Sequence, residues 1–518
     1  MTRPFERAVG RGRRWVAPLA IFVLAGATLV SGGHTTRSAA GVTVDAAAVI
    51  GTLDTRLETG INYPNLFDRA QGTRPLLRAF GAPLVRIAAT YDGCCWAGGP
   101  APMIPAGLVK GRWDFSSLDS VVNEITAAGA RPVLNIFHAP EWMWDCSTGS
   151  LRDQTFGEFA DYMARLVAYY NTGSFIAEDG RTITNPAGVA NRITNWELWN
   201  EPDLPPIACL PNRVPNISAT QYVAMWNATG QKMLAVDPSI KLIGPATDAP
   251  DYISALMTDA LRKPDVVSFH GYGGWTVAQS DQFLFDGLDG IVRSLTQTRA
   301  LAPGIPVWLT ELNTNSAWGD DPTHRPYNAY GAAWGASAFR LLALGGASEL
   351  FQYELVHPDN PMFQLVDPAT GVPRLPYWRD YYLARYFPPG STLLSSSSSV
   401  AGIETLAARA PGSTNVHVLV VNRNVDSPSA VGGPGVPATV EVSVADLSGV
   451  TQVSLREFND ATPLTSGPPA TALPVGENAT VTFTGYGAAI LDFITSSPPV
   501  PSPGIAASNA YFAAGLVQ

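Results

Sequence analysis

Two glutamates are notable because each closes a short apolar run. Glu201 follows the run Trp196–Trp199 in the segment Asn-Glu-Pro, and Glu311 follows the run Val307–Leu309. A carboxyl group can act as acid, base or nucleophile, and two carboxyls in different environments can divide these roles. Two such groups flanking one bond are the arrangement that breaks glycosidic bonds. The pair therefore predicts acid and nucleophile chemistry on a sugar.

The surroundings assign the roles. Glu201 lies in a turn that Pro202 ends, beside tryptophans whose burial would raise its pKa, so it is predicted to be the acid. Glu311 must stay ionised to act as a nucleophile, and Arg86, near the end of another apolar run, is a candidate cation. The alternative partner for Arg86 is Glu197, within the same run as Trp196, and both pairings can hold together. Either glutamate alone is equally explained as a structural carboxylate.

Further polar and aromatic residues follow other apolar runs. His270 and Tyr272 end one run, where Tyr272 could donate a hydrogen bond to Glu311 and His270 could contact a sugar hydroxyl. Aromatic rings stack on the apolar faces of sugars, which makes loop tryptophans candidate sugar contacts. The candidates in loops are His138, Trp142, Trp275 and Trp318, and ordinary loop packing is the alternative for each. Gln352, Tyr353 and Glu354 are weaker candidates.

The positions of these residues depend on the order of the runs. Eight short apolar runs alternate with helix-like stretches, at 60–63, 84–88, 132–137, 196–199, 241–244, 266–269, 307–309 and 350–353. Runs without alternation are typical of strands covered on both faces. The pattern predicts a (β/α)8 TIM barrel, in the α/β class, over residues 41–388. A doubly wound sheet is the main alternative, but no Gly-rich phosphate loop follows the first run.

A second domain is predicted after Pro388. Segments such as 416–421, 438–444 and 480–483 are short, β-branched and separated by Gly/Pro turns, which predicts a β-sandwich over 389–495. Residues 41–57 belong either to the barrel or to this sandwich. The Pro/Ser-rich tail 496–518 is predicted to be disordered.

Composition limits the partners. The 518 residues carry a net charge of −10, and the basic residues concentrate at the N-terminus, so nucleic acid is not an expected partner. Hydrophobic residues make up 46% and charged residues 15%, which allows a large core. Such a body suits a neutral carbohydrate substrate.

The N-terminus predicts export. Residues 1–40 combine an arginine-rich start, an apolar stretch and the small residues Ala39 and Ala40, which is typical of a secretory signal peptide. An uncleaved anchor is the alternative, and no other membrane segment is expected. The four cysteines, Cys94, Cys95, Cys146 and Cys209, permit two disulfides in an exported protein, with the connectivity open. Their spacing fits no zinc pattern.

Two motifs carry a family resemblance. Trp-Glu-Leu-Trp-Asn-Glu-Pro-Asp at 196–203 and Leu-Thr-Glu-Leu-Asn-Thr-Asn-Ser at 309–316 resemble clan A glycoside hydrolases, most closely family 39, which includes β-xylosidases and α-L-iduronidases. The resemblance implies a barrel with an appended sandwich and a retaining mechanism without metal or cofactor. It implies that Glu201 is the acid/base and Glu311 the nucleophile. It also implies that Asn200 contacts the sugar 2-hydroxyl, with Arg86, His270 and Tyr272 in support.

Two stretches depart from the family pattern. Phe137–Pro140 and Gln352–Glu354 differ from what xylosidases and many clan members carry, and both bear on which sugar is bound. The sequence thus predicts a secreted retaining glycoside hydrolase of unspecified sugar. A non-catalytic carbohydrate-binding or cell-surface protein on the same scaffold is the alternative. A serine hydrolase is disfavoured because no Gly-x-Ser-x-Gly elbow follows a strand.

Overall fold

The structure is a computed structural model that describes residues 41–62, 73–89, 103–204, 217–317, 319–357 and 360–496. The predicted signal peptide, nearly all of the predicted tail, Trp318 and three cysteines (Cys94, Cys95 and Cys209) lie outside these ranges. Within them, no helix is both long and apolar enough to cross a lipid bilayer.

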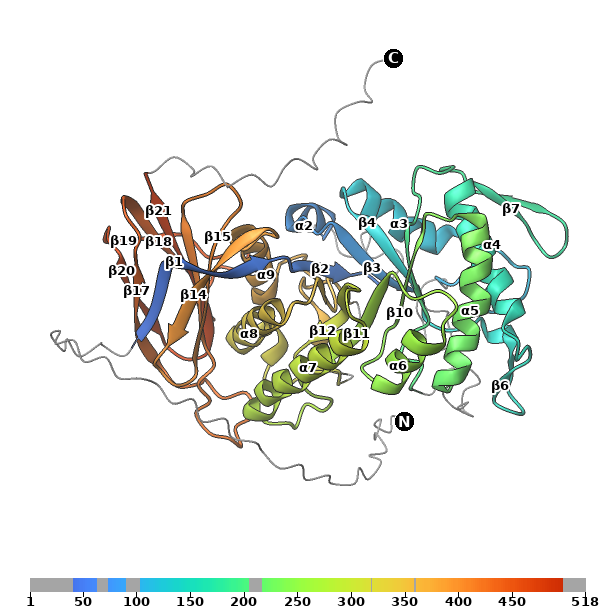
Figure 1. The fold of residues 1–518 in the computed structure, drawn as a ribbon. Helices are drawn as coiled ribbons and strands as arrows, with labels where there is room; N and C mark the ends of the chain where they lie inside the picture. The colour runs from blue at the N-terminus through green and yellow to red at the C-terminus, as the bar shows by residue number, and fades with distance from the viewer. Residues whose placement is uncertain are drawn as a thin grey trace, which may run out of the picture. The chain divides into compact units, whose positions relative to one another are not determined.

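Eight parallel strands close into a barrel, which confirms the predicted fold class (Figure 1). In chain order they are β2 (Arg56–Gly60), β3 (Leu84–Ala89), β4 (Arg131–Ile136), β9 (Asn195–Leu198), β10 (Lys241–Pro245), β11 (Val266–Tyr272), β12 (Val307–Asn313) and β13 (Glu349–Gln352). Pairing of β13 with β2 closes the ring. Parallel strands place their carboxyl ends at one rim, where barrel enzymes carry their active sites.

The first barrel strand lies earlier than predicted. The apolar run at 60–63 marks only the end of β2, whose own residues include Arg56 and Glu58. Glu58 is nevertheless fully buried, and its Oε2 accepts a 2.8 Å hydrogen bond from the backbone N–H of Leu84. Burial, reinforced by the nearby charge of Glu349, raises the pKa of Glu58 well above its usual range. A neutral, hydrogen-bonded carboxyl can occupy a barrel core, which a hydrophobic pattern does not reveal.

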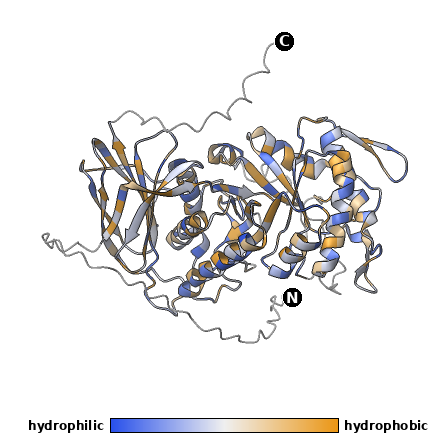
Figure 2. Ribbon diagram, viewed as in Figure 1, coloured by the Kyte–Doolittle hydropathy of each residue, from blue (hydrophilic) through white to orange (hydrophobic). Residues whose placement is uncertain are grey.

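Amphipathic helices surround the barrel. They are α2 (Thr73–Phe80), α3 (Ser116–Ala127), α4 (Gly157–Thr172), α5 (Ala219–Val236), α6 (Pro250–Asp259), α7 (Asp281–Leu301), α8 (Ala329–Gly345) and α9 (Leu375–Tyr386). Figure 2 shows mixed orange and blue faces on several of them, such as α5, as expected where one face is buried, whereas α8 is buried on all sides along most of its length. Short elements in the loops are η1 (Glu141–Met143), β5 (Trp144–Asp145), β6 (Ser150–Leu151), β7 (Ser174–Ile176), β8 (Thr182–Thr184), η2 (Arg325–Tyr327) and η3 (Pro361–Phe363).

The C-terminal strands form one nine-stranded mixed sheet. Its strands are β1 (Gly41–Leu53), β14 (Ser391–Ser398), β15 (Ile403–Arg409), β16 (Val416–Asn422), β17 (Ala438–Ala445), β18 (Val450–Phe458), β19 (Thr471–Leu473), β20 (Asn478–Phe483) and β21 (Gly487–Thr495). β1 lies between β14, to which it is antiparallel, and β17, to which it is parallel. Valines from distant strands, such as Val442 of β17 and Val418 of β16, share one apolar core. The sheet therefore folds over its own core, as a sandwich does.

The sheet and the barrel share a second core. Residues of α7, α8 and α9 pack with Leu419 and Val421 of β16 and Ile490 of β21 in one cluster. α8 is buried along most of its length, because α8 and α9 lie between the barrel strands and the sheet (Figure 1). The two parts are thus joined by an interface that resembles a domain interior.

This shared core predicts cooperative unfolding. Replacing the fully buried Leu419 by alanine (Leu419→Ala) should lower the free energy of unfolding by about 2–5 kcal/mol. Urea unfolding followed by tryptophan fluorescence and by circular dichroism should still give one coincident transition. The exposed Thr439 of β17 offers a control, since Thr439→Ala should change stability by less than about 0.5 kcal/mol. Separate barrel and sheet transitions in Leu419→Ala would contradict the shared core.

Candidate active site

The two predicted glutamates meet at the carboxyl rim of the barrel. Glu201 lies in the turn after β9, and Glu311 lies within β12. One oxygen from each carboxyl and one ring nitrogen of His270 all lie within 4.8 Å of one another. The side chain of Glu201 is 29% exposed, whereas that of Glu311 is 8% exposed. Residues 110 positions apart in the chain are therefore neighbours with unequal access to solvent.

Arg86 is the central cation of the site. Its side chain is 1% exposed, and it donates three hydrogen bonds: Nε to Glu197 Oε2 at 2.6 Å, Nη1 to Glu311 Oε1 at 2.8 Å and Nη2 to Asn200 Oδ1 at 2.7 Å. Burial alone would lower the pKa of Arg86, but the carboxylates of Glu197 and Glu311 raise it above its usual value. Both pairings predicted for Arg86 are thus present together, and its charge is permanent.

Glu197 is the buried ion-pair partner of Arg86. Its side chain is fully buried on β9, and its Oε2 also accepts a 3.0 Å hydrogen bond from Asn135 Nδ2 on β4. Burial would raise the pKa of Glu197, but the charges of Arg86 and His270, with the hydrogen bonds, lower it. Glu197 therefore remains ionised and balances part of the Arg86 charge. Asn135 was missed by sequence reasoning, and the available signal was an amide within the apolar run 132–137.

Tyr272 and His270 contact the two glutamates from β11. The Tyr272 hydroxyl donates a 2.5 Å hydrogen bond to Glu311 Oε2, so each oxygen of Glu311 has its own donor. Burial and the Glu311 charge raise the pKa of Tyr272 well above its usual value, which keeps the hydroxyl a donor. His270 Nδ1 lies 3.0 Å from Glu201 Oε1 and 3.5 Å from Glu311 Oε2. Burial lowers the pKa of His270, but the two carboxylates raise it more.

The backbone turn after β9 aims Glu201. Trp199 and Glu201 both have positive φ angles, 69° and 43°, which non-glycine residues rarely adopt. Neighbouring strand ends hold the turn, since Asn200 N–H donates to the carbonyl of Phe137 and Glu201 N–H donates to that of Ala246. Strained backbone held from both sides is a common feature of functional sites.

The predicted aromatic contacts lie in several surroundings. His138 is buried and packs against Phe137 and Trp199, and burial lowers its pKa to about 4. Trp142 donates its indole N–H to the carbonyl of Ala106, and Lys110 lies over its ring. Trp275 is 44% exposed and packs edge-on against Phe283. Their contacts with a substrate stay predictions, as does the role of Trp318, which lies outside the described residues.

Glu354 is a buried acid near Glu311. It follows β13, is fully buried, and accepts a 3.0 Å hydrogen bond at Oε2 from the backbone N–H of Asn62. Asn62 Oδ1 in turn accepts from the N–H of Ala88, two residues beyond Arg86. Burial chiefly, and also the charge of Glu311, raise the pKa of Glu354 well above 4.5, while Arg86 opposes the shift. A neutral Glu354 thus joins three strand ends without adding charge.

Glu201, His270 and Glu311 are also close enough to share one metal ion. Each of their facing atoms already has a partner in the described structure: His270 for Glu201, and Arg86 with Tyr272 for Glu311. The arrangement therefore satisfies its own charges, and the expectation that no metal or cofactor is required stays a prediction.

The state of Glu354 predicts a pH-dependent stability difference. An acid whose pKa rises on folding stabilises the fold fully below its unfolded pKa and loses this contribution as pH rises towards its folded pKa. Glu354→Gln removes that loss, so the variant should gain stability relative to the parent as pH rises above about 4.5, by at most about 1.4 kcal/mol per pH unit. Urea unfolding at pH 5, 6, 7 and 8 measures the difference. The exposed Glu441→Gln on β17 is the matched control, and a difference that stays constant with pH would show that Glu354 is ionised in the fold.

Comparisons with known proteins agree with this geometry. A family model described as Cellulase (glycosyl hydrolase family 5) matches residues 55–344, which is more than half of the chain. No curated protein matches the chain in sequence.

Solved structures share the whole architecture. A monomeric β-xylosidase from Caulobacter crescentus CB15 is 16% identical, with a TM-score of 0.61 over 89% of this chain and 100% of its own. A family 51 α-L-arabinofuranosidase from Bifidobacterium longum is 14% identical, with a TM-score of 0.61 over 88% and 100%. A GH30 endoxylanase from Clostridium papyrosolvens C71 is 13% identical, with a TM-score of 0.56 over 88% and 100%. At these identities the likeness shows the fold alone.

The barrel, the rim with its two glutamates and the family match point to one conclusion. The predicted clan is confirmed, whereas the closer likeness to family 39 is not. The chain belongs to the cellulase family, glycosyl hydrolase family 5, of the clan A glycoside hydrolases, and it is a glycosidase.

Proposed function

We propose that the chain is a retaining glycosidase in which Glu311 is the nucleophile and Glu201 the acid/base. The observation that carries this proposal is the separation of the two carboxyls, with facing oxygens within 4.8 Å. Retaining enzymes need a separation of about 5–5.5 Å, whereas inverting enzymes need about 6.5–9.5 Å to admit a water molecule between carboxyl and sugar.

The environments support unequal roles. Arg86 and Tyr272 each donate to one oxygen of Glu311, which favours a carboxylate fixed in one orientation. Glu201 is more exposed and faces His270, so a proton and a water molecule can reach it. An acid/base must exchange protons during the cycle, which requires such access.

The proposed reaction has two displacements. A Glu311 oxygen bonds to the anomeric carbon while the glycosidic C–O bond breaks, and Glu201 gives its proton to the leaving oxygen. Glu201 then takes a proton from water, whose oxygen displaces Glu311 from the anomeric carbon. The sugar is released with its original configuration, and both glutamates return to their starting states. We expect Asn200, whose Oδ1 accepts a hydrogen bond from Arg86, to contact the 2-hydroxyl of the sugar.

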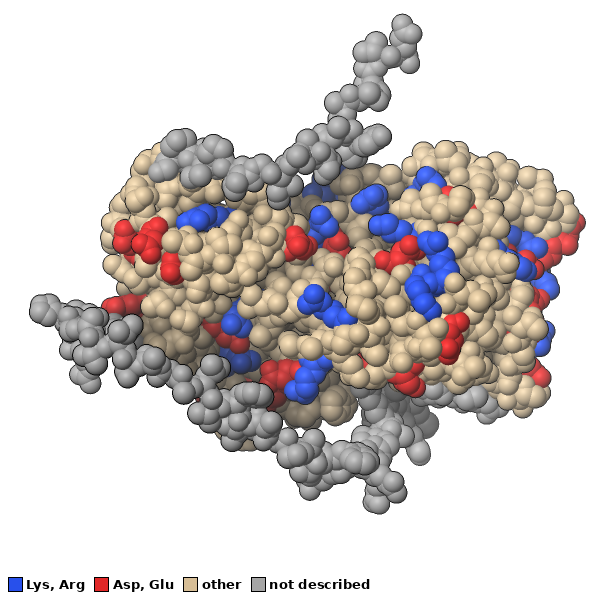
Figure 3. Space-filling model, viewed as in Figure 1, with Lys and Arg blue, Asp and Glu red and all other residues tan. Residues whose placement is uncertain are grey.

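Export and substrate class complete the proposal. We expect export, with removal of residues 1–40 after the small residues Ala39 and Ala40. Cys146 is not a free thiol, and pairing of the cysteines in an oxidising compartment fits that route. On the face shown in Figure 3, basic and acidic side chains are interspersed, which fits a carbohydrate better than a nucleic acid. The likeness of 309–316 to family 39 stays a prediction, and the sugar is left to experiment.

The nucleophile and the acid/base are distinguishable with azide. Glu311→Ala should abolish hydrolysis of aryl xylosides, arabinosides, galactosides, glucosides or uronides, whichever the parent cleaves. Azide should then attack the anomeric carbon once and give a glycosyl azide of inverted configuration. Glu201→Ala should lose more than about 100-fold in turnover on poor leaving groups, and azide should give a product of retained configuration.

Proton NMR of the products identifies each configuration. Glu441→Ala, on the exposed face of β17, is the control for preparation and folding. Undiminished hydrolysis by Glu311→Ala would contradict the assignment. Oligosaccharide binding without turnover by the parent, across the panel, would instead support the non-catalytic alternative.

A further inference from the structure

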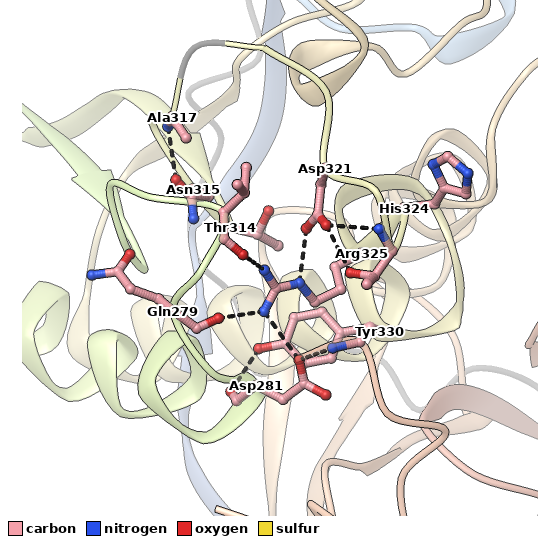
Figure 4. Close-up of polar contacts among 12 residues, drawn as sticks. Gln279, Asp281, Thr314, Asn315, Ala317, Asp321, His324, Arg325 and Tyr330 are labelled. Atoms are coloured by element: carbon pink, nitrogen blue, oxygen red, sulfur yellow. Dashed lines mark hydrogen bonds and ion pairs between the residues drawn. The ribbon is translucent and has the colours of Figure 1, made fainter. Parts of the chain in front are cut away.

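A buried ion pair connects the active-site rim to the C-terminal sheet. Asp281 begins α7, Arg325 begins η2, and both side chains are 0% exposed. Arg325 Nη1 lies 3.1 Å from Asp281 Oδ1, and its Nε donates to Asp321 Oδ2 at 2.8 Å. Figure 4 shows the guanidinium between the two carboxylates. Breaking such a pair from one side is costly, because the remaining charge is left buried.

Arg325 also fixes the backbone of the loop that follows β11. Its guanidinium donates at 2.6 Å to the backbone carbonyls of Val277 and of Gln279. Gln279 Oε1 in turn accepts from the N–H groups of Trp275 and Thr276, at 2.7 and 3.0 Å. The loop 273–280 is therefore fixed at both its centre and its end.

The same loop is tied to the segment after the nucleophile strand. The N–H of Ser316 donates to the carbonyl of Gly274 at 2.9 Å, and Asn315 Nδ2 donates to that of Thr276 at 2.8 Å. Both segments start at strands that carry active-site residues, namely β11 with Tyr272 and β12 with Glu311. Arg325 is thus connected, through the loop 273–280, to the residues that follow both strands.

The C-terminal sheet supplies the other side of this arrangement. In the loop between β16 and β17, the N–H groups of Gly432 and Gly433 donate to Asp281 Oδ1 and Oδ2 at 2.8 and 2.9 Å. The N–H of Asp281 donates back to the carbonyl of Ala430 at 2.8 Å. Gly432 has a φ of +70°, and a Cβ there would lie 2.2 Å from Thr323 Cβ. Only glycine fits this contact.

The loop held in this way presents aromatic surface. Trp275, three residues beyond Tyr272, is 44% exposed, and Phe283 of α7 beside it is 40% exposed. Their ring centroids lie 5.3 Å apart at an interplanar angle of 82°. Exposed rings at a fixed angle offer stacking surface to sugar units without losing side-chain freedom on binding.

We propose that residues 430–433 of the C-terminal sheet, acting through Asp281 and Arg325, position Trp275 and Phe283 as a binding platform for sugar units beyond the bond that is cut. The proposal rests on the proposed function and adds a role for the sheet domain. It implies that the natural substrate is an oligosaccharide or polysaccharide longer than the cleaved sugar and its leaving group.

Hydrogen exchange tests the positioning without a substrate. Gly432→Ala should raise amide exchange in peptides covering 273–280 by at least about tenfold, while peptides from α4 and α5 stay unchanged. Gly412→Ala is the matched control, since Gly412 has a φ of +71° but no atom near its missing Cβ. If Gly432→Ala fails to fold, Tyr486→Phe replaces it, because it removes only one 3.3 Å hydrogen bond to Asp281. Unchanged exchange in 273–280 would overturn the positioning role.

Kinetics test the platform. Trp275→Ala should raise KM for an oligosaccharide by roughly 3- to 10-fold with little change in kcat. Gly432→Ala should raise the same KM, with a smaller effect on an aryl monoglycoside, and Gly412→Ala should leave both unchanged. In the Trp275→Ala background the effect of Gly432→Ala should largely vanish, since the two act on one contact.

The outcomes separate the two proposals. Equal effects of Gly432→Ala on aryl glycoside and oligosaccharide, or an unchanged KM in Trp275→Ala, would overturn the platform while leaving the glycosidase intact. An inactive parent protein would refute the retaining mechanism, whereas the exchange experiment would still report on the positioning of 273–280.

Discussion

The site depends on one buried cation. The guanidinium of Arg86 contacts carboxylates from β9 and β12 and the amide of Asn200, so three parts of the rim are fixed by one group. A planar guanidinium suits this task because its donors lie in a rigid fork. Removing it would leave two carboxylates facing each other in a poorly hydrated space, which is among the costliest changes a core can undergo. The orientation of Glu311 is therefore inseparable from the stability of the barrel centre.

Charge is distributed unevenly around this cation. Glu197 and Glu311 share the charge of Arg86, and Glu354 approaches the same group as a neutral acid. Tyr272 contributes a neutral hydroxyl donor, because burial and the charge of Glu311 raise its pKa. His270 contributes a ring whose pKa the carboxylates of Glu311 and Glu201 raise. One centre thus holds acids in different states, and the states follow from distance to Arg86 and from exposure. The proposed mechanism relies on unequal environments of this kind, since Glu311 attacks while the more exposed Glu201 exchanges protons.

Sequence patterns predict the barrel well because strands covered on both faces carry long apolar runs. They locate Glu201, Glu311 and Arg86 because polar groups at the ends of such runs meet at one rim. They fail where buried polar groups interrupt the apolar runs. The charged residues Arg56 and Glu58 hid most of β2, so the first strand was predicted too late, and Asn135 was not recognised as part of the site. They also fail for Asp281 and Gly432, which pair across 151 residues and two domains, and for Arg325, whose partner Asp281 lies 44 residues away. Sequence reading relies on the periodicity of apolar residues, and contacts between distant charges and backbone amides leave no such periodic signal.

The place of β1 in the C-terminal sheet has a consequence for biosynthesis. The first described strand of the chain pairs with β14 and β17, both of which are made after the entire barrel. The barrel is accordingly an insertion between the first and second strands of the sheet domain. Because chains are synthesised from the N-terminus, both edges of β1 stay unpaired until synthesis reaches β14, at the start of the last quarter of the protein. Truncating the chain between the barrel and β14 would remove both pairing partners of β1, so the barrel and the sheet are not separable modules.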